Sequence, residues 1–230
     1  MTDAEKGLVI FDCDGVLVDS EPLSVSVLIQ AMHDVGVDMS EEDVYSRFLG
    51  KSLATLVDTL QTEFDVFIDQ VFLDRIRNDL YERFKHELKP IDGIAATLDA
   101  LTLPRCVASS SQLERIRLSL GVTGLLQRLE PNIFSASMVK RGKPAPDLFL
   151  FAAERMGVAP GDCIVVEDSP AGITAARAAG MTVFAFTGGS HAHSPSYRAE
   201  LEQLSPEVVF DAMPDLIHLV RKHRSDGTHS

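Results

Sequence analysis

Acidic residues stand in pairs at two points of the chain where a short apolar run ends. The runs are residues 8–11 and 163–166, and short apolar runs of this kind are typical of strands buried on both faces of a sheet. The acids that follow them are Asp12, Asp14, Glu167 and Asp168. For the first pair alone two interpretations stay open, because Asp14 precedes a glycine and Asp-Gly is also a common solvent-facing turn.

The second pair favours the interpretation in which the acids act together. If the two strands are near neighbours, all four carboxylates converge on one edge of the sheet, and burying even one unpaired charge is costly. A bound cation is the simplest remedy. Oxygen ligands without an accompanying His or Cys select Mg²⁺, which commonly takes a substrate phosphate as a further ligand. The acids therefore indicate phosphate chemistry.

Hydroxyl and amine groups suited to a phosphate occur at two other predicted element ends. Ser109 and Ser110 follow the apolar run 106–108 and would present hydroxyls and backbone amides at the start of a helix, where an anion is favoured. Simple capping of that helix is the alternative. Lys143 opens a further predicted helix and would supply a positive charge at the same edge, although a lone lysine is more often a solvated surface residue.

The elements that must position these residues follow an alternating pattern. Apolar runs predict strands at residues 8–11, 106–108, 133–134, 163–166, 183–186 and 208–210. The helical patterns between the later runs stop at Gly121, Gly157 and Gly180, where left-handed helix ends are expected. Alternating strands and helices predict an α/β fold, a Rossmann-like three-layer core with a parallel sheet.

Residues 20–87 interrupt this alternation with a helical period throughout. Ser40 and Asp43 resemble a capping box, and Ser52 is a predicted N-cap. We therefore expect two domains: a core of residues 1–19 and 88–230, and an inserted α-helical bundle of residues 20–87. Because the insertion follows the first strand, it would lie over the carboxyl end of the sheet, where open α/β sheets bind ligands.

Composition narrows the classes of partner and the location. The formal net charge is −13, which disfavours nucleic acid as a partner because nucleic-acid binding draws on Lys and Arg. No run of eighteen apolar residues and no apolar stretch after a charged amino terminus is present, so we expect no membrane association and a cytoplasmic protein.

The cysteines and two of the histidines match no metal or disulfide pattern. Cys13, Cys106 and Cys163 are far apart in the sequence and are expected to be buried thiols. His191 and His193 follow a Gly-Gly pair, and we expect them in a flexible polar loop near the site entrance.

Taken in order, four segments resemble the four signature motifs of the haloacid dehalogenase superfamily. They are residues 11–20, Ser109, residues 142–147 and residues 166–172. The helical insertion resembles the cap of the phosphoglycolate phosphatase and β-phosphoglucomutase branch of that superfamily.

The resemblance implies a role for each matching residue. Asp12 would be the nucleophile that becomes an aspartyl phosphate, and Asp14 would carry the proton. Mg²⁺ would be held by Asp12, the backbone carbonyl of Asp14 and Asp168, with Glu167 as a ligand or a holder of metal-bound water. The groups that would bind the substrate are Ser109, Ser110, Lys143, Gly50 and Lys51.

The function implied is hydrolysis of a small phosphorylated metabolite, such as a sugar, polyol or sugar-acid phosphate, by a monomer whose cap covers its own site. A β-phosphoglucomutase-like phosphosugar mutase is the alternative. It is disfavoured because Ser24 and Leu53 stand at about the positions of that mutase's hinge His and phosphate-binding cap Arg, two groups that help it hold a bisphosphate intermediate. A noncatalytic phospho-acceptor would not need the insertion. Asp14 argues against a dehalogenase or a phosphonoacetaldehyde hydrolase, which resemble this chain but lack that acid.

Overall fold

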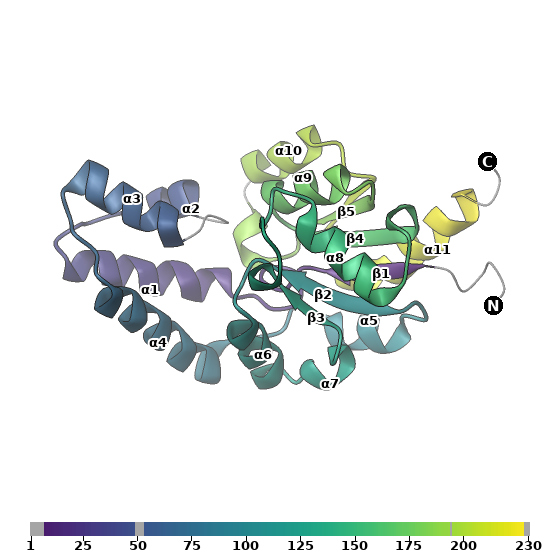
Figure 1. The fold of residues 1–230 in the computed structure, drawn as a ribbon, viewed down its shortest axis with the longest axis horizontal. Coiled ribbons are helices and arrows are strands. Elements are labelled where there is room, and N and C mark those ends of the chain that lie inside the picture. The colour runs from purple at the N-terminus through teal and green to yellow at the C-terminus, as the bar shows by residue number, and fades with distance from the viewer. Residues whose placement is uncertain (1–6, 49–52, 194, 228–230) are drawn as a thin grey trace. The chain divides into compact units, whose positions relative to one another are not determined.

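The computed structural model describes residues 7–48, 53–193 and 195–227. The chain divides into two units, Met1–Asp19 with Lys89–Ser230, and Ser20–Leu88 (Figure 1). The assignment of residues 1–19 with 88–230 and of residues 20–87 to separate domains stays a prediction.

The first unit is built on one six-stranded sheet of order β3-β2-β1-β4-β5-β6. Its strands are β1 (Leu8–Phe11), β2 (Arg105–Ser109), β3 (Ile133–Ser135), β4 (Cys163–Glu167), β5 (Thr182–Phe186) and β6 (Val208–Phe210). All neighbouring pairs are parallel. The predicted α/β fold with a parallel sheet is therefore confirmed. The strand order reverses direction at β1, which is where open α/β sheets bind ligands.

Helices cover this sheet and close its core. They are α5 (Ile94–Ala100), α6 (Leu113–Val122), α7 (Leu126–Leu129), α8 (Asp147–Met156), α9 (Pro170–Ala178), α10 (Pro195–Gln203) and α11 (Leu216–Gly227), with short 3-10 turns at Ala136–Met138, Pro160–Asp162, Ser190–His193 and Met213–Asp215. Leu8 and Ile10 of β1 share a buried cluster with residues of α8, α9 and α10. Val9 and Phe11 point to the other face and are equally buried, so β1 is covered on both sides.

One predicted helix end is wrong. Gly121 lies within α6, and the left-handed residue is Gly124, with φ of +72°. The amide of Leu125 donates to the carbonyl of Leu120, and the buried Leu125 side chain draws the chain back toward the helix. Gly157 and Gly180 do adopt the predicted left-handed conformation, with φ of +68° and +73°.

The second unit is helical, as its sequence period predicts. Its helices are α1 (Glu21–Asp34), α2 (Glu41–Phe48), α3 (Leu53–Phe64) and α4 (Gln70–Glu87). The predicted capping box is present, since the amide of Asp43 donates to Ser40 Oγ (3.1 Å) and the amide of Ser40 donates to Asp43 Oδ2 (3.3 Å). The predicted N-cap at Ser52 lies outside the described residues.

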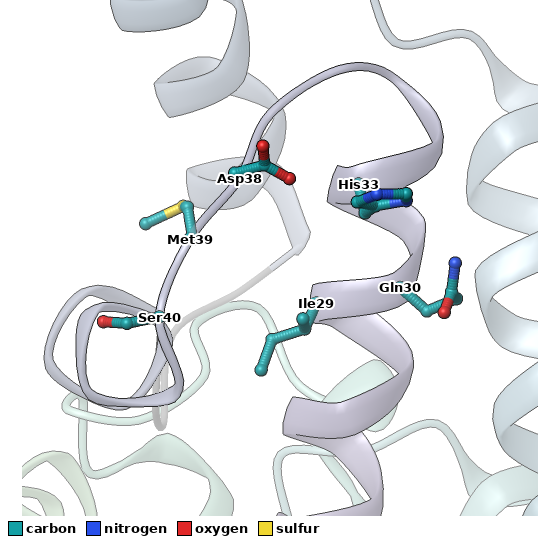
Figure 2. Close-up of a pocket in the computed structure, with 6 residues that line it drawn as sticks. All are labelled: Ile29, Gln30, His33, Asp38, Met39 and Ser40. Atoms are coloured by element: carbon teal, nitrogen blue, oxygen red, sulfur yellow. The ribbon is translucent and has the colours of Figure 1, made fainter.

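A hollow of about 370 Å³ lies in this unit between the last turns of α1 and the segment that leads into α2 (Figure 2). Its lining residues are Ile29, Gln30, His33, Asp38, Met39 and Ser40. None of the predicted catalytic or metal-binding residues lines this hollow.

Candidate active site

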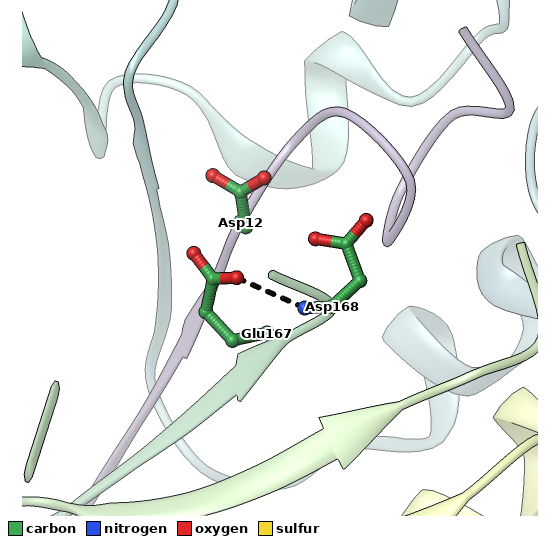
Figure 3. A group of neighbouring side chains, drawn as sticks. All are labelled: Asp12, Glu167 and Asp168. Carbon is green, nitrogen blue, oxygen red and sulfur yellow. Dashed lines mark hydrogen bonds between the residues drawn. The ribbon is translucent and has the colours of Figure 1, made fainter. Parts of the chain in front are cut away.

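Three of the four acids meet at the carboxyl ends of two central strands. In the parallel pair β1 and β4, Phe11 lies opposite Val166, so Asp12 leaves β1 at the level where Glu167 ends β4. A side-chain oxygen from each of Asp12, Glu167 and Asp168 lies within 4.8 Å of the others, and all three residues are buried (Figure 3). Strand pairing thus concentrates negative charge at one point.

Asp14 lies at the same edge but is not part of this group of three carboxylates. Its Oδ2 accepts a hydrogen bond from Ser111 Oγ (2.7 Å), and its Oδ1 pairs with Arg115 Nη2 (2.8 Å). The chain turns directly after Asp12, because the amides of Leu17 and Val18 both donate to the carbonyl of Cys13. Sequence reasoning missed Arg115, for which an arginine one turn beyond the serine cluster was the available signal.

Lys143 is buried within the acidic group, and the interpretation of this residue as a solvated lysine is wrong. Its side chain is 4% exposed, and Nζ lies 2.7 Å from Asp12 Oδ1 and also donates to Glu167 Oε1. Burial by itself would lower the pKa of Lys143, but attraction to the Asp12 and Glu167 carboxylates outweighs it and raises that pKa. The ammonium group is therefore charged and pairs with both acids.

The balance of charge in this group fits a divalent cation. Burial raises the pKa of Asp12 well above its ordinary value, Lys143 lowers it, and Glu167 and Asp168 raise it further. With all three carboxylates ionised, the group and the Lys143 ammonium would carry a formal charge of −2, and burial disfavours that charge on Asp12 unless a cation is bound. A hard divalent ion such as Mg²⁺ would balance the group with oxygen ligands alone.

Glu167 is already engaged by protein donors on both oxygens. Its Oε1 accepts from Lys143, while Oε2 accepts from the amides of Asp168 and Ser169 and from the Ser169 hydroxyl, each at 2.9 Å. Gly172 leaves room for this carboxylate, because a Cβ there would lie 1.8 Å from Oε1. Of the two roles that the resemblance leaves open for Glu167, these contacts favour the one outside the first ring of metal ligands.

The serines at the end of β2 do not cap the following helix. The N-cap of α6 is Gln112, which makes no side-chain capping bond. Ser109 is buried and its Oγ accepts from the amide of Ser111 (3.1 Å), while Ser110 is exposed. The Ser111 carbonyl accepts from Ser135 Oγ (2.7 Å), which anchors the turn. The hydroxyl groups remain at the carboxyl edge, as an anion site requires.

His191 departs from its expected place in a flexible polar loop. It is buried, with its Nε2 2.9 Å from Asp168 Oδ2.

The predicted substrate contacts Gly50 and Lys51 lie outside the described residues. The cysteines Cys13, Cys106 and Cys163 are free thiols and buried, as predicted. None of the helices in the described parts of the chain has the length and apolar character that a membrane crossing requires.

The sequence matches a known protein family. The haloacid dehalogenase-like hydrolase family matches residues 9–186. A 6-phosphogluconate phosphatase of Escherichia coli K12 is 34% identical over 184 residues, covering 80% of this chain and 83% of that enzyme.

Two solved structures resemble the chain over nearly its whole length. A haloacid dehalogenase-like protein of unknown function from Agrobacterium tumefaciens C58 has a TM-score of 0.84 and 38% identity, covering 95% of this chain and 99% of that one. A haloacid dehalogenase family hydrolase from Deinococcus radiodurans R1, with bound phosphate and sodium, has a TM-score of 0.77 and 31% identity, covering 96% and 97%. The chain therefore belongs to the haloacid dehalogenase-like hydrolase family.

Proposed function

We propose that this chain is a Mg²⁺-dependent phosphatase that hydrolyses a small sugar, polyol or sugar-acid phosphate through an aspartyl-phosphate intermediate. Family membership and the phosphatase relative make the chain a phosphoric monoester hydrolase. The observation that carries the finer proposal is the environment of Asp12. Its carboxylate is buried beside Lys143 and next to two further acids, at the switch point of the sheet.

In the first step, an oxygen of Asp12 forms a bond to phosphorus while the bond from phosphorus to the ester oxygen breaks. Asp14 gives a proton to the departing alkoxide. In the second step, water attacks the phosphorus of the aspartyl phosphate, Asp14 takes the water proton, and the Asp12 carboxylate leaves. For the first step to balance, Asp14 must carry its proton when the substrate binds, and the second step restores that proton. Ser111 and Arg115 hold its carboxyl group apart from the buried group.

Charge on the transferring phosphoryl oxygens would be balanced by groups already in place. Lys143 supplies a fixed positive charge, and Ser109 and the amides of the β2–α6 turn supply donors. Asp12, Asp168 and the backbone carbonyl of Asp14 would hold Mg²⁺. When bound, the ion would supply positive charge that lowers the repulsion between an anionic substrate and these acids.

Support for the substrate class comes from the related enzyme and from the sequence. The E. coli relative is named for a phosphorylated sugar acid. Lys51 would offer a positive charge to such a substrate, and Gly50 is its neighbour in the same predicted contact segment. The net charge of −13 opposes a polyanionic nucleic acid as substrate.

Inorganic phosphate release from a panel of sugar, polyol and sugar-acid phosphates, with and without Mg²⁺, tests this function. We expect Mg²⁺-dependent release that is lost in Asp12→Asn and kept in Asp99→Asn, whose carboxylate is exposed and paired with Arg128. β-Glucose 1-phosphate is assayed separately for isomerisation. Isomerisation without net release would make the chain a mutase, and no turnover of any compound would contradict an enzymatic role.

A further inference from the structure

The segment between β5 and α10 carries a histidine that the proposed reaction does not use. His191 is 8% exposed as a residue and 1% exposed in its side chain. Its Nε2 lies 2.9 Å from Oδ2 of Asp168, an acid that the proposed function assigns to the metal. The imidazole therefore contacts the side chain of a predicted metal ligand.

Glycine backbones form the slot that holds this ring. A Cβ on Gly15 would lie 2.8 Å from His191 Cε1 and 1.9 Å from Asp168 Oδ2. A Cβ on Gly189 would lie 2.9 Å from both His191 Cε1 and the Gly15 carbonyl oxygen. A side chain at either position would collide with the ring or the carboxylate. The backbones at Gly15 and Gly189 therefore pack directly against the His191 ring.

Neighbouring contacts fix the same segment in place. The amide of Ser190 donates to Asp19 Oδ1 (3.1 Å), and the Ser190 hydroxyl donates to Asp19 Oδ2. Tyr197 packs edge-on against the His191 ring, with centroids 5.5 Å apart, and its hydroxyl donates to the Asp168 carbonyl oxygen (3.0 Å). Asp168 is thus held through its side chain by His191 and through its backbone by Tyr197.

We infer that His191 is a positioning residue that sets the Mg²⁺ affinity of the site by fixing the orientation of the Asp168 carboxylate. The inference rests on the proposed function, because it needs Asp168 to be a metal ligand. A hydrogen bond from Nε2 to Oδ2 leaves Oδ1 of Asp168 available to a cation. It also restricts rotation of the carboxylate, which would otherwise be frozen only when the metal binds.

The test compares variants that keep or remove the hydrogen-bond donor. His191→Gln retains an N–H that reaches Asp168, while His191→Leu removes it, and both lose the ring contact with Tyr197. His223→Leu is the control, because His223 packs edge-on against Phe184 and contacts none of the site acids. Isothermal titration of the metal-free full chain with MgCl₂ gives the dissociation constant of each.

We expect the wild-type chain and His223→Leu to bind Mg²⁺ alike, and His191→Leu to bind roughly 10- to 100-fold more weakly. His191→Gln should recover most of that loss. Phosphate release should then show a raised Mg²⁺ requirement in His191→Leu, with turnover at saturating Mg²⁺ within about threefold of wild type. A general loss of structure would not produce this separation.

Equal Mg²⁺ affinity of folded His191→Leu and wild type would overturn the inference. If His191→Leu does not fold, as judged by circular dichroism, His191→Asn replaces it, because its shorter amide cannot reach Asp168. His191→Asn binding as tightly as His191→Gln would then overturn it. Failure of the wild-type chain itself to bind Mg²⁺ would contradict the proposed function, and this is measured first.

Discussion

Asp12 and Asp14 stand two residues apart, yet their carboxylates have different surroundings. Asp12 is buried against Lys143 and two acids, whereas Asp14 is held by Ser111 and Arg115. A nucleophile must stay ionised beside the phosphate, whereas a proton carrier must exchange its proton with the leaving group and with water. The two residues therefore have separate partners, as two separate tasks require.

Asp14→Asn should separate the two steps of the reaction. With alkyl phosphates we expect turnover to fall roughly 10²- to 10⁴-fold, because the leaving alkoxide is no longer protonated. With p-nitrophenyl phosphate, whose leaving group needs little help, the first step should survive and the second should not. Stopped-flow absorbance should then show a burst of about one p-nitrophenol per enzyme. Equal losses on both substrates, with no burst, would contradict a proton-carrier role, and Asp99→Asn is the matched control.

Lys143→Met should destabilise the fold as well as abolish turnover. Methionine retains most of the side-chain volume but leaves the Asp12 and Glu167 carboxylates without their buried cation. Removing one partner of a buried ion pair typically costs about 3–5 kcal/mol, so urea unfolding without Mg²⁺ should show a loss of that order. Lys140→Met, at an exposed position in the same segment, provides the comparison. A loss no larger than that of Lys140→Met would exclude a structural role for the pair.

At the scale of the elements, the end of β4 and the start of α9 form a single unit around Glu167. Ser169 caps α9 by accepting from the amide of Gly172 (3.1 Å) and donates to Glu167 Oε2 (2.9 Å). The same turn therefore ends a strand, begins a helix and fixes a carboxylate. Gly172 is needed because the carboxylate lies where its side chain would be.

Gly172→Ala should push the Glu167 carboxylate out of its place. A Cβ 1.8 Å from Oε1 forces the acid to move, which breaks its contact with Lys143. We expect a loss of about 1–3 kcal/mol in the free energy of unfolding and weaker Mg²⁺ binding.

Gly121→Ala is the control, because nothing lies within 4 Å of its Cβ and it is inside α6. That change should stabilise by up to about 1 kcal/mol. Chemical denaturation of both variants decides, and an unchanged Gly172→Ala would disprove the crowding.

At the scale of the whole molecule, the fold assembles the site from segments far apart in the chain. Asp12 and Lys143 are separated by 131 positions, and Asp14 and Arg115 by 101. The sheet order, with β1 between β2 and β4, brings these segments to one edge. Excess negative charge at that edge opposes folding in the absence of a cation.

Mg²⁺ should therefore stabilise the entire chain. An ion that binds only the folded state at 100 times its dissociation constant adds about 2.7 kcal/mol to the free energy of unfolding. We expect the melting temperature to rise with Mg²⁺ and to return after chelation with EDTA. Asp168→Asn should lose the effect, and NaCl at matched ionic strength should not reproduce it. A melting temperature indifferent to Mg²⁺ would contradict the metal site.

Local patterns in the sequence were sufficient for the fold class, the strands and the presence of acids at two strand ends. Strand period and breakers depend on nearby residues, and parallel strands bring their carboxyl ends to one edge whatever their loops do. The helix end at Gly121 was predicted wrongly, because the choice between Gly121 and Gly124 depends on where Leu125 packs.

Only the tertiary structure decided which groups touch the acids. Lys143 is buried rather than solvated, Arg115 holds Asp14, and His191 reaches Asp168. Each contact joins residues that lie at or beyond the ends of different strands, and the glycine slot around His191 exists only when two loops are packed together. Such contacts depend on how distant segments pack in three dimensions. The residue types and spacing within one segment do not specify that packing.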